Sequence, residues 1–230
     1  FAFGIDSSGD IYYRMSDMDD GAGAAITDTM ATGQPISAGV LTHVVMVFDK
    51  TNAKMIYYKN GALEETATPF ESTPAVLDTD SSKVWLGRFP FATTSYLNGT
   101  INEVSCWDTV LSLAEVQELY NDGKALDALT HSNSNLLGYW RNNGLAEWED
   151  LKGSNDGTPT SLTETLLLPA GVDGSRDNQG FLMNRQKDTN ALNLTGVYDY
   201  VTVADSSSLD TIAGTSDYTI SAWVCATKDI

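Results

Sequence analysis

Short apolar runs separated by turn-forming residues recur along the chain. Residues 1–5 and 11–15 flank five such turn residues, which predicts a β-hairpin. Residues 43–48 form a near-continuous apolar run of strand length, and residues 54–58 follow it and lead into an Asn-Gly pair at 60–61. An Asn-Gly pair after such a run is the strongest short-range hairpin signal. The pattern is typical of an antiparallel β protein.

Five further runs predict strands: residues 83–88, 100–107, 137–141, 198–204 and 218–226. The last run alternates with the period of two that is characteristic of a β-strand. By contrast, residues 16–39 are polar and rich in glycine, and residues 142–190 contain few periodic apolar positions. We expect both of these stretches to be loops.

A single helix is predicted between the strands. Ser112 followed by Glu115 has the spacing of a capping box, in which each side chain bonds the backbone N–H of the other residue. Apolar residues then recur at helical spacing: Leu113, Val116, Leu119 and Tyr120. Gly123 is placed to end the helix in the left-handed conformation. The pattern therefore predicts an all-β antiparallel sandwich with one short α-helix near 112–122.

Composition and charge narrow the classes of partner. The chain has 230 residues, of which 42% are hydrophobic, enough to bury a sizeable core. Thirteen Lys and Arg residues against 31 Asp and Glu residues give a net charge of −18, which repels nucleic acid and anionic lipid. No apolar run approaches the roughly 20 residues that cross a bilayer. We therefore predict no nucleic-acid partner and no membrane insertion.

The two cysteines, Cys106 and Cys225, are too few to act as a disulfide framework for a chain of this size. Each lies inside a strand-like run, where a buried free thiol and a disulfide both account for it. Of the two alternatives, we favour free thiols.

Several of these segments together resemble the laminin-G-like, concanavalin A-like jelly-roll modules of bacterial adhesins, lectins and virion proteins. The matching stretches are residues 191–201, 218–224, 42–44, 58–61, 86–88 and 97–104, followed by the capped helix. They cover nearly the whole chain, and their combination is more specific than any one of them. The resemblance implies a jelly-roll sandwich at an extracellular, cell-surface or virion-surface location.

The order of the segments differs from that of the family. There, segments equivalent to residues 136–230 come first and those equivalent to 1–127 come after. We therefore divide the chain into three ranges: residues 1–127, the C-terminal part of a laminin-G-like module; residues 128–190, a linker and the opening strand of the next module; and residues 191–230, first strands of a module. The first range alone would leave strand edges unpaired, so we expect residues 191–226 to cover them.

Three arrangements satisfy this expectation. The chain is a window cut from a tandem array, or a subunit that donates its last strands to a neighbouring copy, or a permuted module that closes on itself. We favour the tandem array, and we expect a homo-oligomer or an array.

The residues do not suggest an enzyme. The resemblance implies that hydrolases of this fold carry a Glu-x-Asp-x-Glu strand, and this sequence has no such triplet. The nearest stretch, residues 147–150, is interpreted as a solvated acidic loop. His43 begins an apolar strand and is interpreted as structural, His131 lies in a loop, and no Ser or Cys partner is evident for either.

The resemblance also implies a possible structural calcium ion. The positions that hold it in the family match Asn102, the Gly196 carbonyl and Asp199. The family usually has Asp at the positions of Asn102, Thr195 and Tyr198. Each of these three differences removes a charged oxygen ligand. An acidic loop at residues 17–21 lacks the spacing of a hand-type calcium motif.

Aromatic residues supply the candidate glycan contacts, since a pyranose ring presents an apolar face and a polar rim. If Tyr58 and Leu86 point into the core, strand alternation directs Tyr57 and Trp85 outward. Phe89 and Tyr96 lie in the adjoining loop. These four outward or loop aromatics, Tyr57, Trp85, Phe89 and Tyr96, are the candidate glycan-binding residues. Packing of such a patch against a neighbouring module is the alternative, and of the two we favour packing.

We therefore predict a non-catalytic adhesive or glycan-binding module of a cell-surface or virion-surface protein. Its partners are glycans or copies of itself. The alternative is a purely structural virion or filament subunit that assembles by strand complementation and binds no sugar.

Overall fold

The computed structural model describes residues 2–5, 9–16, 25–29, 35–67, 84–88, 96–141, 148–161, 163–166, 190–196, 198–209 and 216–226. The strands in chain order are β1 (Ala2–Ile5), β2 (Ile11–Ser16), β3 (Ala25–Thr29), β4 (Thr42–Asp49), β5 (Lys54–Lys59), β6 (Ala62–Ala67), β7 (Val84–Leu86), β8 (Asn98–Trp107), β9 (Leu136–Trp140), β10 (Gly157–Thr160), β11 (Thr163–Leu166), β12 (Asn190–Thr195), β13 (Tyr200–Val203) and β14 (Tyr218–Ala226). Helix α1 spans Leu113–Tyr120, and two 3-10 turns, η1 (Asn121–Gly123) and η2 (Ala128–Thr130), follow it.

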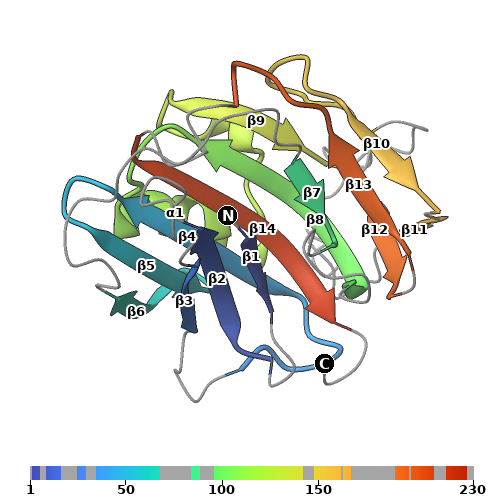
Figure 1. Ribbon diagram of the computed structural model, residues 1–230, viewed down its shortest axis with the longest axis horizontal. Helices are drawn as coiled ribbons and strands as arrows, with labels where there is room; N and C mark the ends of the chain where they lie inside the picture. The colour runs from blue at the N-terminus through green and yellow to red at the C-terminus, as the bar shows by residue number, and fades with distance from the viewer. Residues whose placement is uncertain are drawn as a thin grey trace.

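One large antiparallel sheet forms the centre of the protein (Figure 1). Its strand order is β11-β12-β8-β14-β4-β5-β6, and β9 pairs with β8 beside this path. The strand β14 is the last of the described strands in sequence, yet it lies between β8 and β4. Tyr218 is opposite Phe48 on one side, and Thr219 is opposite Trp107 on the other.

These pairings confirm that residues 191–226 complete the sheet begun by the first 127 residues, and here they do so within one chain. All three sequence ranges contribute strands to this sheet: β8 comes from the first, β9 from the second and β14 from the third. The boundaries at 127/128 and 190/191 stay a prediction, and so does the tandem array.

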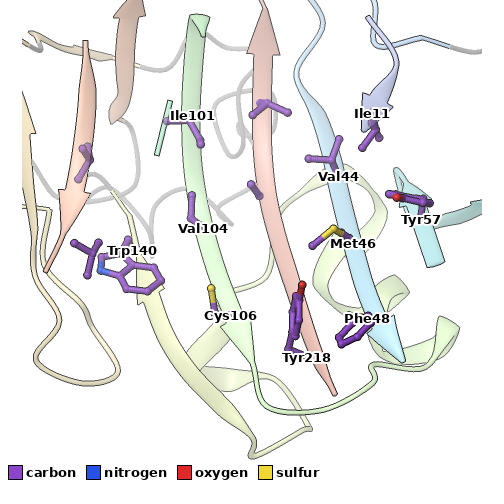
Figure 2. Close-up of a cluster of buried hydrophobic side chains, with 14 of the residues drawn as sticks. Ile11, Val44, Met46, Phe48, Tyr57, Ile101, Val104, Cys106, Trp140 and Tyr218 are labelled. Atoms are coloured by element: carbon purple, nitrogen blue, oxygen red, sulfur yellow. The ribbon is translucent and has the colours of Figure 1, made fainter. Parts of the chain in front are cut away.

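Two smaller three-stranded sheets cover one face of the large sheet. Their orders are β1-β2-β3 and β10-β13-β7. Ile11 of β2 and Val201 of β13 pack in the same buried cluster as Val44 and Met46 of β4. Figure 2 shows side chains of this cluster, to which Trp140 of β9 also belongs. The smaller sheets therefore form the second layer of an all-β sandwich, as predicted.

The strand β4 is buried on both faces, which explains its near-continuous apolar sequence. Val44, Met46 and Phe48 face the second layer, whereas Val45 and Val47 pack in another cluster with residues of α1. All eight residues of β4 are buried. Helix α1 thus forms a third layer over part of the opposite face of the large sheet.

The capping box of α1 is confirmed, but the predicted end of the helix is wrong. The backbone N–H of Ser112 donates to Glu115 Oε2 at 2.8 Å, and Ser112 Oγ accepts from the Glu115 N–H at 3.4 Å. The helix ends at Asn121, with φ +45°, rather than at Gly123. Asparagine tolerates the left-handed conformation, so the chain reverses two residues before the glycine.

Three strands lie in stretches that the sequence predicted as loops: β3, β10 and β11. Their sequences, AITDT, GTPT and TETL, have no sustained alternation of apolar and polar residues. They are strands because a neighbouring strand supplies the hydrogen bonds, as β13 does for β10 and β12 does for β11. A partner distant in sequence leaves no local signal.

Both cysteines are free, as we favoured. Cys106 is opposite Ile220 in β14, whereas Cys225 is opposite Thr100 in β8. Six residue steps along β8 separate these positions, about 20 Å at ~3.3 Å per residue, far beyond the reach of a disulfide.

The central position of β14 makes its large buried side chains sensitive to truncation. We expect Trp223→Ala to lower the free energy of unfolding by about 3–5 kcal/mol, because Trp223 is 4% exposed and its removal leaves a cavity. Leu63→Ala is the matched control: Leu63 is 52% exposed on the edge strand β6, and we expect a change within about 0.5 kcal/mol. Urea denaturation measures both, and equal losses would contradict the central role of β14.

Candidate functional site

The outer face of the sheet β10-β13-β7 carries aromatic side chains, among them Trp85, one of the predicted glycan-binding residues. In β7, Leu86 is opposite Val201, which is fully buried, and Leu86 packs against the same core. Trp85 is opposite Thr202. Side chains alternate between the faces of a strand, so Trp85 lies on the outer face, as strand alternation predicted.

Gly87 breaks this alternation. Its φ is +82°, and a side chain there would meet Leu194 of β12, because an added Cβ would lie 2.9 Å from Leu194 Cδ1. The break turns Arg88 to the same face as Trp85, and the guanidinium carbon lies 4.8 Å from the centre of the Trp85 ring. Strict alternation from Trp85 would place Arg88 on the opposite face, so sequence reasoning missed Arg88.

Two tyrosines complete the surroundings of Arg88. Tyr96 forms an antiparallel bridge with Arg88, and its ring centre lies 5.5 Å from the guanidinium carbon. The corresponding distance for Tyr200, the first residue of β13, is 5.0 Å. Tyr200 also lies 5.1 Å from Trp85, measured between ring centres. Three rings therefore surround one cation.

A further tyrosine extends this group to the surface. Tyr198 is 64% exposed, and its ring meets that of Tyr96 edge-to-face at 5.6 Å between centres. Its φ is +64°, a conformation that bulky side chains rarely adopt and that costs on the order of 1–3 kcal/mol. We refer to Trp85, Arg88, Tyr96, Tyr198 and Tyr200 together as the aromatic–arginine patch.

Threonine hydroxyls lie beside the patch on the same face. Thr202 is opposite Trp85, Thr158 is opposite Thr202, and Thr160 is opposite Tyr200. Thr158 is exposed. The face therefore combines aromatic rings, a cation and small polar groups that both donate and accept hydrogen bonds.

Two of the predicted glycan-binding residues, Trp85 and Tyr96, come together in the patch, and the other two do not. The outward orientation predicted for Tyr57 is wrong: the side chain is fully buried in the core cluster (Figure 2), while the adjacent Tyr58 packs in the cluster under α1. The error arises because β5, like β4, has both faces covered. Phe89 lies outside the described residues.

The predicted calcium-binding residues do not come together as a set. Gly196 lies against Asn98, since an added Cβ would be 2.9 Å from Asn98 Cβ. Asn102 is four residues further along β8, about 13 Å at ~3.3 Å per residue, whereas a calcium ion holds its oxygens at about 2.3–2.6 Å. Asp199 is near Gly196, but one of its carboxylate oxygens, Oδ2, already accepts from Thr195 N at 2.6 Å and from the Thr195 hydroxyl.

These three residues therefore do not fit one calcium ion, because Asn102 is too distant from the corner that holds Gly196 and Asp199. A calcium ion at that corner alone stays a prediction. The acidic loop at residues 17–21 lies outside the described residues.

His43 has a serine partner that the sequence did not suggest. Its Nε2 lies 2.8 Å from Ser221 Oγ, and its ring lies 5.1 Å from Trp223 and 6.0 Å from Tyr120 between centres. His43 is 1% exposed and Ser221 is 2% exposed. Burial lowers the pKa of His43 to about 3. The pair is enclosed in the protein, in keeping with the structural role predicted for His43.

His131 is also structural in its contacts. Its Nε2 lies 3.0 Å from the Glu115 carbonyl oxygen of α1, and its Nδ1 accepts from the Asn133 N–H. The ring packs edge-on against Trp107 at 4.6 Å between centres. His131 therefore links α1 to the segment that follows it.

The interpretation of residues 147–150 as a solvated loop is wrong for its described part. Trp148 and Asp150 are buried. The Asp150 carboxylate accepts from the backbone N–H groups of Tyr139, Lys152 and Asn155. The Asp150 carboxylate organises the turn that leads into β10. A run of acidic residues in the sequence does not indicate such backbone hydrogen bonds.

Another buried carboxylate is paired with arginine. Arg141 contacts Glu103 at 3.1 Å and Asp127 at 3.3 Å, and the Tyr139 hydroxyl donates to Glu103. Burial raises the pKa of Tyr139 well above its ordinary value. These groups satisfy one another inside the protein.

Comparison with known proteins gives one match. The family model of the concanavalin A-like lectin/glucanases superfamily, a laminin-G-like domain, matches residues 1–117, about half of the chain. The chain therefore belongs to this superfamily and is a lectin-like β-sandwich module. No curated protein and no solved structure matches it. None of the helices in the described part of the chain has the length and apolar character needed to cross a bilayer.

The burial of His43 predicts a pH-dependent stability. The unfolded imidazole has its ordinary pKa of 6.5 and takes up a proton below that pH, whereas the folded one does so only near pH 3. Stability from this group is therefore complete above pH 6.5 and falls as the pH drops toward 3, by about 1.4 kcal/mol per pH unit.

His43→Phe removes this titration, so we expect its free energy of unfolding to vary less steeply between pH 6 and pH 4 than that of the wild type. Ser221→Ala keeps the imidazole and should keep the wild-type slope. Urea denaturation at several pH values measures both, and identical slopes for the wild type and His43→Phe would refute the assignment.

Proposed function

We propose that the protein is a non-catalytic, glycan-binding adhesive module that holds a saccharide on the aromatic–arginine patch. The observation that carries the proposal is the convergence of Trp85, Tyr96, Tyr198 and Tyr200 on one outer face beside threonine hydroxyls. A pyranose stacks its C–H face on an aromatic ring and directs its hydroxyl groups to polar side chains at the rim.

The backbone at Tyr198 supports this proposal. The left-handed backbone of Tyr198, with φ +64°, is strained, and its aromatic ring is 64% exposed to solvent. Both the backbone strain and the exposure of the ring are energetically unfavourable. Such features concentrate at binding sites, where a ligand covers the ring.

The absence of catalysis and the extracellular location are parts of the same proposal. Within the described residues, the carboxylates of Glu103, Asp127 and Asp150 accept hydrogen bonds from Arg141, Tyr139 or the backbone, which leaves them poorly suited to act as acid and base. Laminin-G-like domains are typically extracellular, which agrees with a module at a cell or virion surface.

Assembly by strand complementation is the alternative, and the contacts favour it less. The chain fills the central position of its own sheet with β14. The edge strand β6 carries Glu64 and Glu65, and Glu64 lies 3.7 Å from Lys59. Charged residues on an edge strand discourage pairing with another chain.

Trp85→Ala tests the proposal. We expect the wild-type protein to bind at least one glycan on an array and the variant to bind it at least tenfold more weakly, because stacking of the sugar on the indole ring is lost. Leu129→Ala is the control, since Leu129 is 49% exposed but lies in η2, next to α1, away from the patch. A blank array for the wild type, together with a solution mass above that of a monomer, would favour the structural alternative.

A further inference from the structure

We propose that the saccharide recognised by the aromatic–arginine patch carries a carboxylate, and that Arg88 is the residue that binds it. This inference rests on the proposed glycan binding and narrows it to acidic sugars such as uronic or sialic acids. Arg88 is a cation on the surface of a protein whose net charge is −18.

Contact with the three rings does not by itself use the hydrogen-bonding capacity of Arg88. Trp85, Tyr96 and Tyr200 lie 4.8 to 5.5 Å from the guanidinium carbon, at distances typical of cation–π contact. Such contacts hold the planar group in place through the ring faces, but they do not replace the acceptor oxygens that guanidinium N–H groups require.

No protein carboxylate supplies those oxygens in the part of the chain that the structure describes. Arg141 contacts two carboxylates, whereas Arg88 has none within ion-pair distance among the described residues. Its Nε is buried and has no hydrogen-bond partner there. The chain has 31 acidic residues against 13 basic ones, so Arg88 differs from Arg141 in its described partners although acidic residues are in excess.

The surroundings of Arg88 suit a single carboxylate on a short saccharide. The neighbouring rings and the burial of Nε lower the local dielectric around the guanidinium group, which strengthens a charge-assisted hydrogen bond formed at its terminal nitrogens. A planar carboxylate matches the two-pronged donor geometry of arginine. The net charge of −18 opposes a long polyanion, but salt screens that repulsion beyond about 10 Å at 0.1 M, so contact with one carboxylate at the patch is less affected.

The test compares each acidic oligosaccharide with its carboxyl-reduced counterpart. The probes are oligosaccharides that contain glucuronate, galacturonate or sialic acid, and titration calorimetry at 0.15 M NaCl measures their binding to the full chain. We expect at least one acidic probe to bind at least tenfold more tightly than its reduced form. Arg88→Gln should abolish this preference while retaining weak binding of the reduced sugar, and Arg88→Lys should restore it only in part, because a lysine ammonium lacks the planar donor pair.

The controls separate this inference from the proposed function. Leu129→Ala should bind like the wild type, and the thermal unfolding of Arg88→Gln shows whether the variant is folded. Equal binding of acidic and reduced sugars by the wild type, or a preference that survives Arg88→Gln, would overturn the inference while leaving glycan binding intact. If neither form of any sugar binds, or if the patch instead joins two copies of the chain in a way that Trp85→Ala abolishes, the proposed function itself fails.

Discussion

The pairing of β14 with both β8 and β4 is the constraint on which the rest of the structure depends. One side of the large sheet contains β8, β12 and β11, and the other contains β4, β5 and β6; in the sheet order only β14 joins them. Its residues make ladder hydrogen bonds on both edges, and most of its side chains are buried. Because β14 is the last described strand in sequence, this contact is also among the least local in the chain, so the two sides of the sheet become one layer only when the distant end of the chain is in place.

The same sheet explains which side chains remain available at the surface. The smaller sheets cover one face, and α1 with its following segment covers part of the other, so β4 and β5 have no solvent-facing side along much of their length. Tyr57 and Tyr58 are therefore both buried, although alternation directs them to opposite faces. The sheet β10-β13-β7 differs: Val201 faces the core and Trp85 faces outward, which leaves an aromatic surface on this sheet.

The aromatic–arginine patch is assembled from separate parts of the sequence by two unusual backbone positions. Gly87 turns Arg88 to the face of Trp85, and Tyr198 is held in the left-handed conformation beside Tyr96. The turn at Tyr198 is stabilised by Asp199, whose carboxylate accepts from Thr195. Asp199, which the family resemblance relates to calcium binding, thus helps to position the patch through a hydrogen bond. The positive charge at the centre of the patch is the side chain of Arg88.

Local features of the sequence were sufficient to predict the long strands, the capping box at Ser112 and Glu115 and the outward position of Trp85, because the periods and caps that indicate them lie within a few residues. The family was identified from the resemblance of several short segments taken together. Only the tertiary structure decided that the helix ends at Asn121, that β3, β10 and β11 are strands, that Tyr57 is buried, and that Asn102 lies far from Gly196. Each of these depends on a partner strand, a covering layer or a backbone reversal. Arg88 is the clearest case. The sequence shows that the residue is positively charged, but its position among three rings follows from the φ of Gly87 and from the register of β7 against β13. The pattern of residues along the chain contains neither.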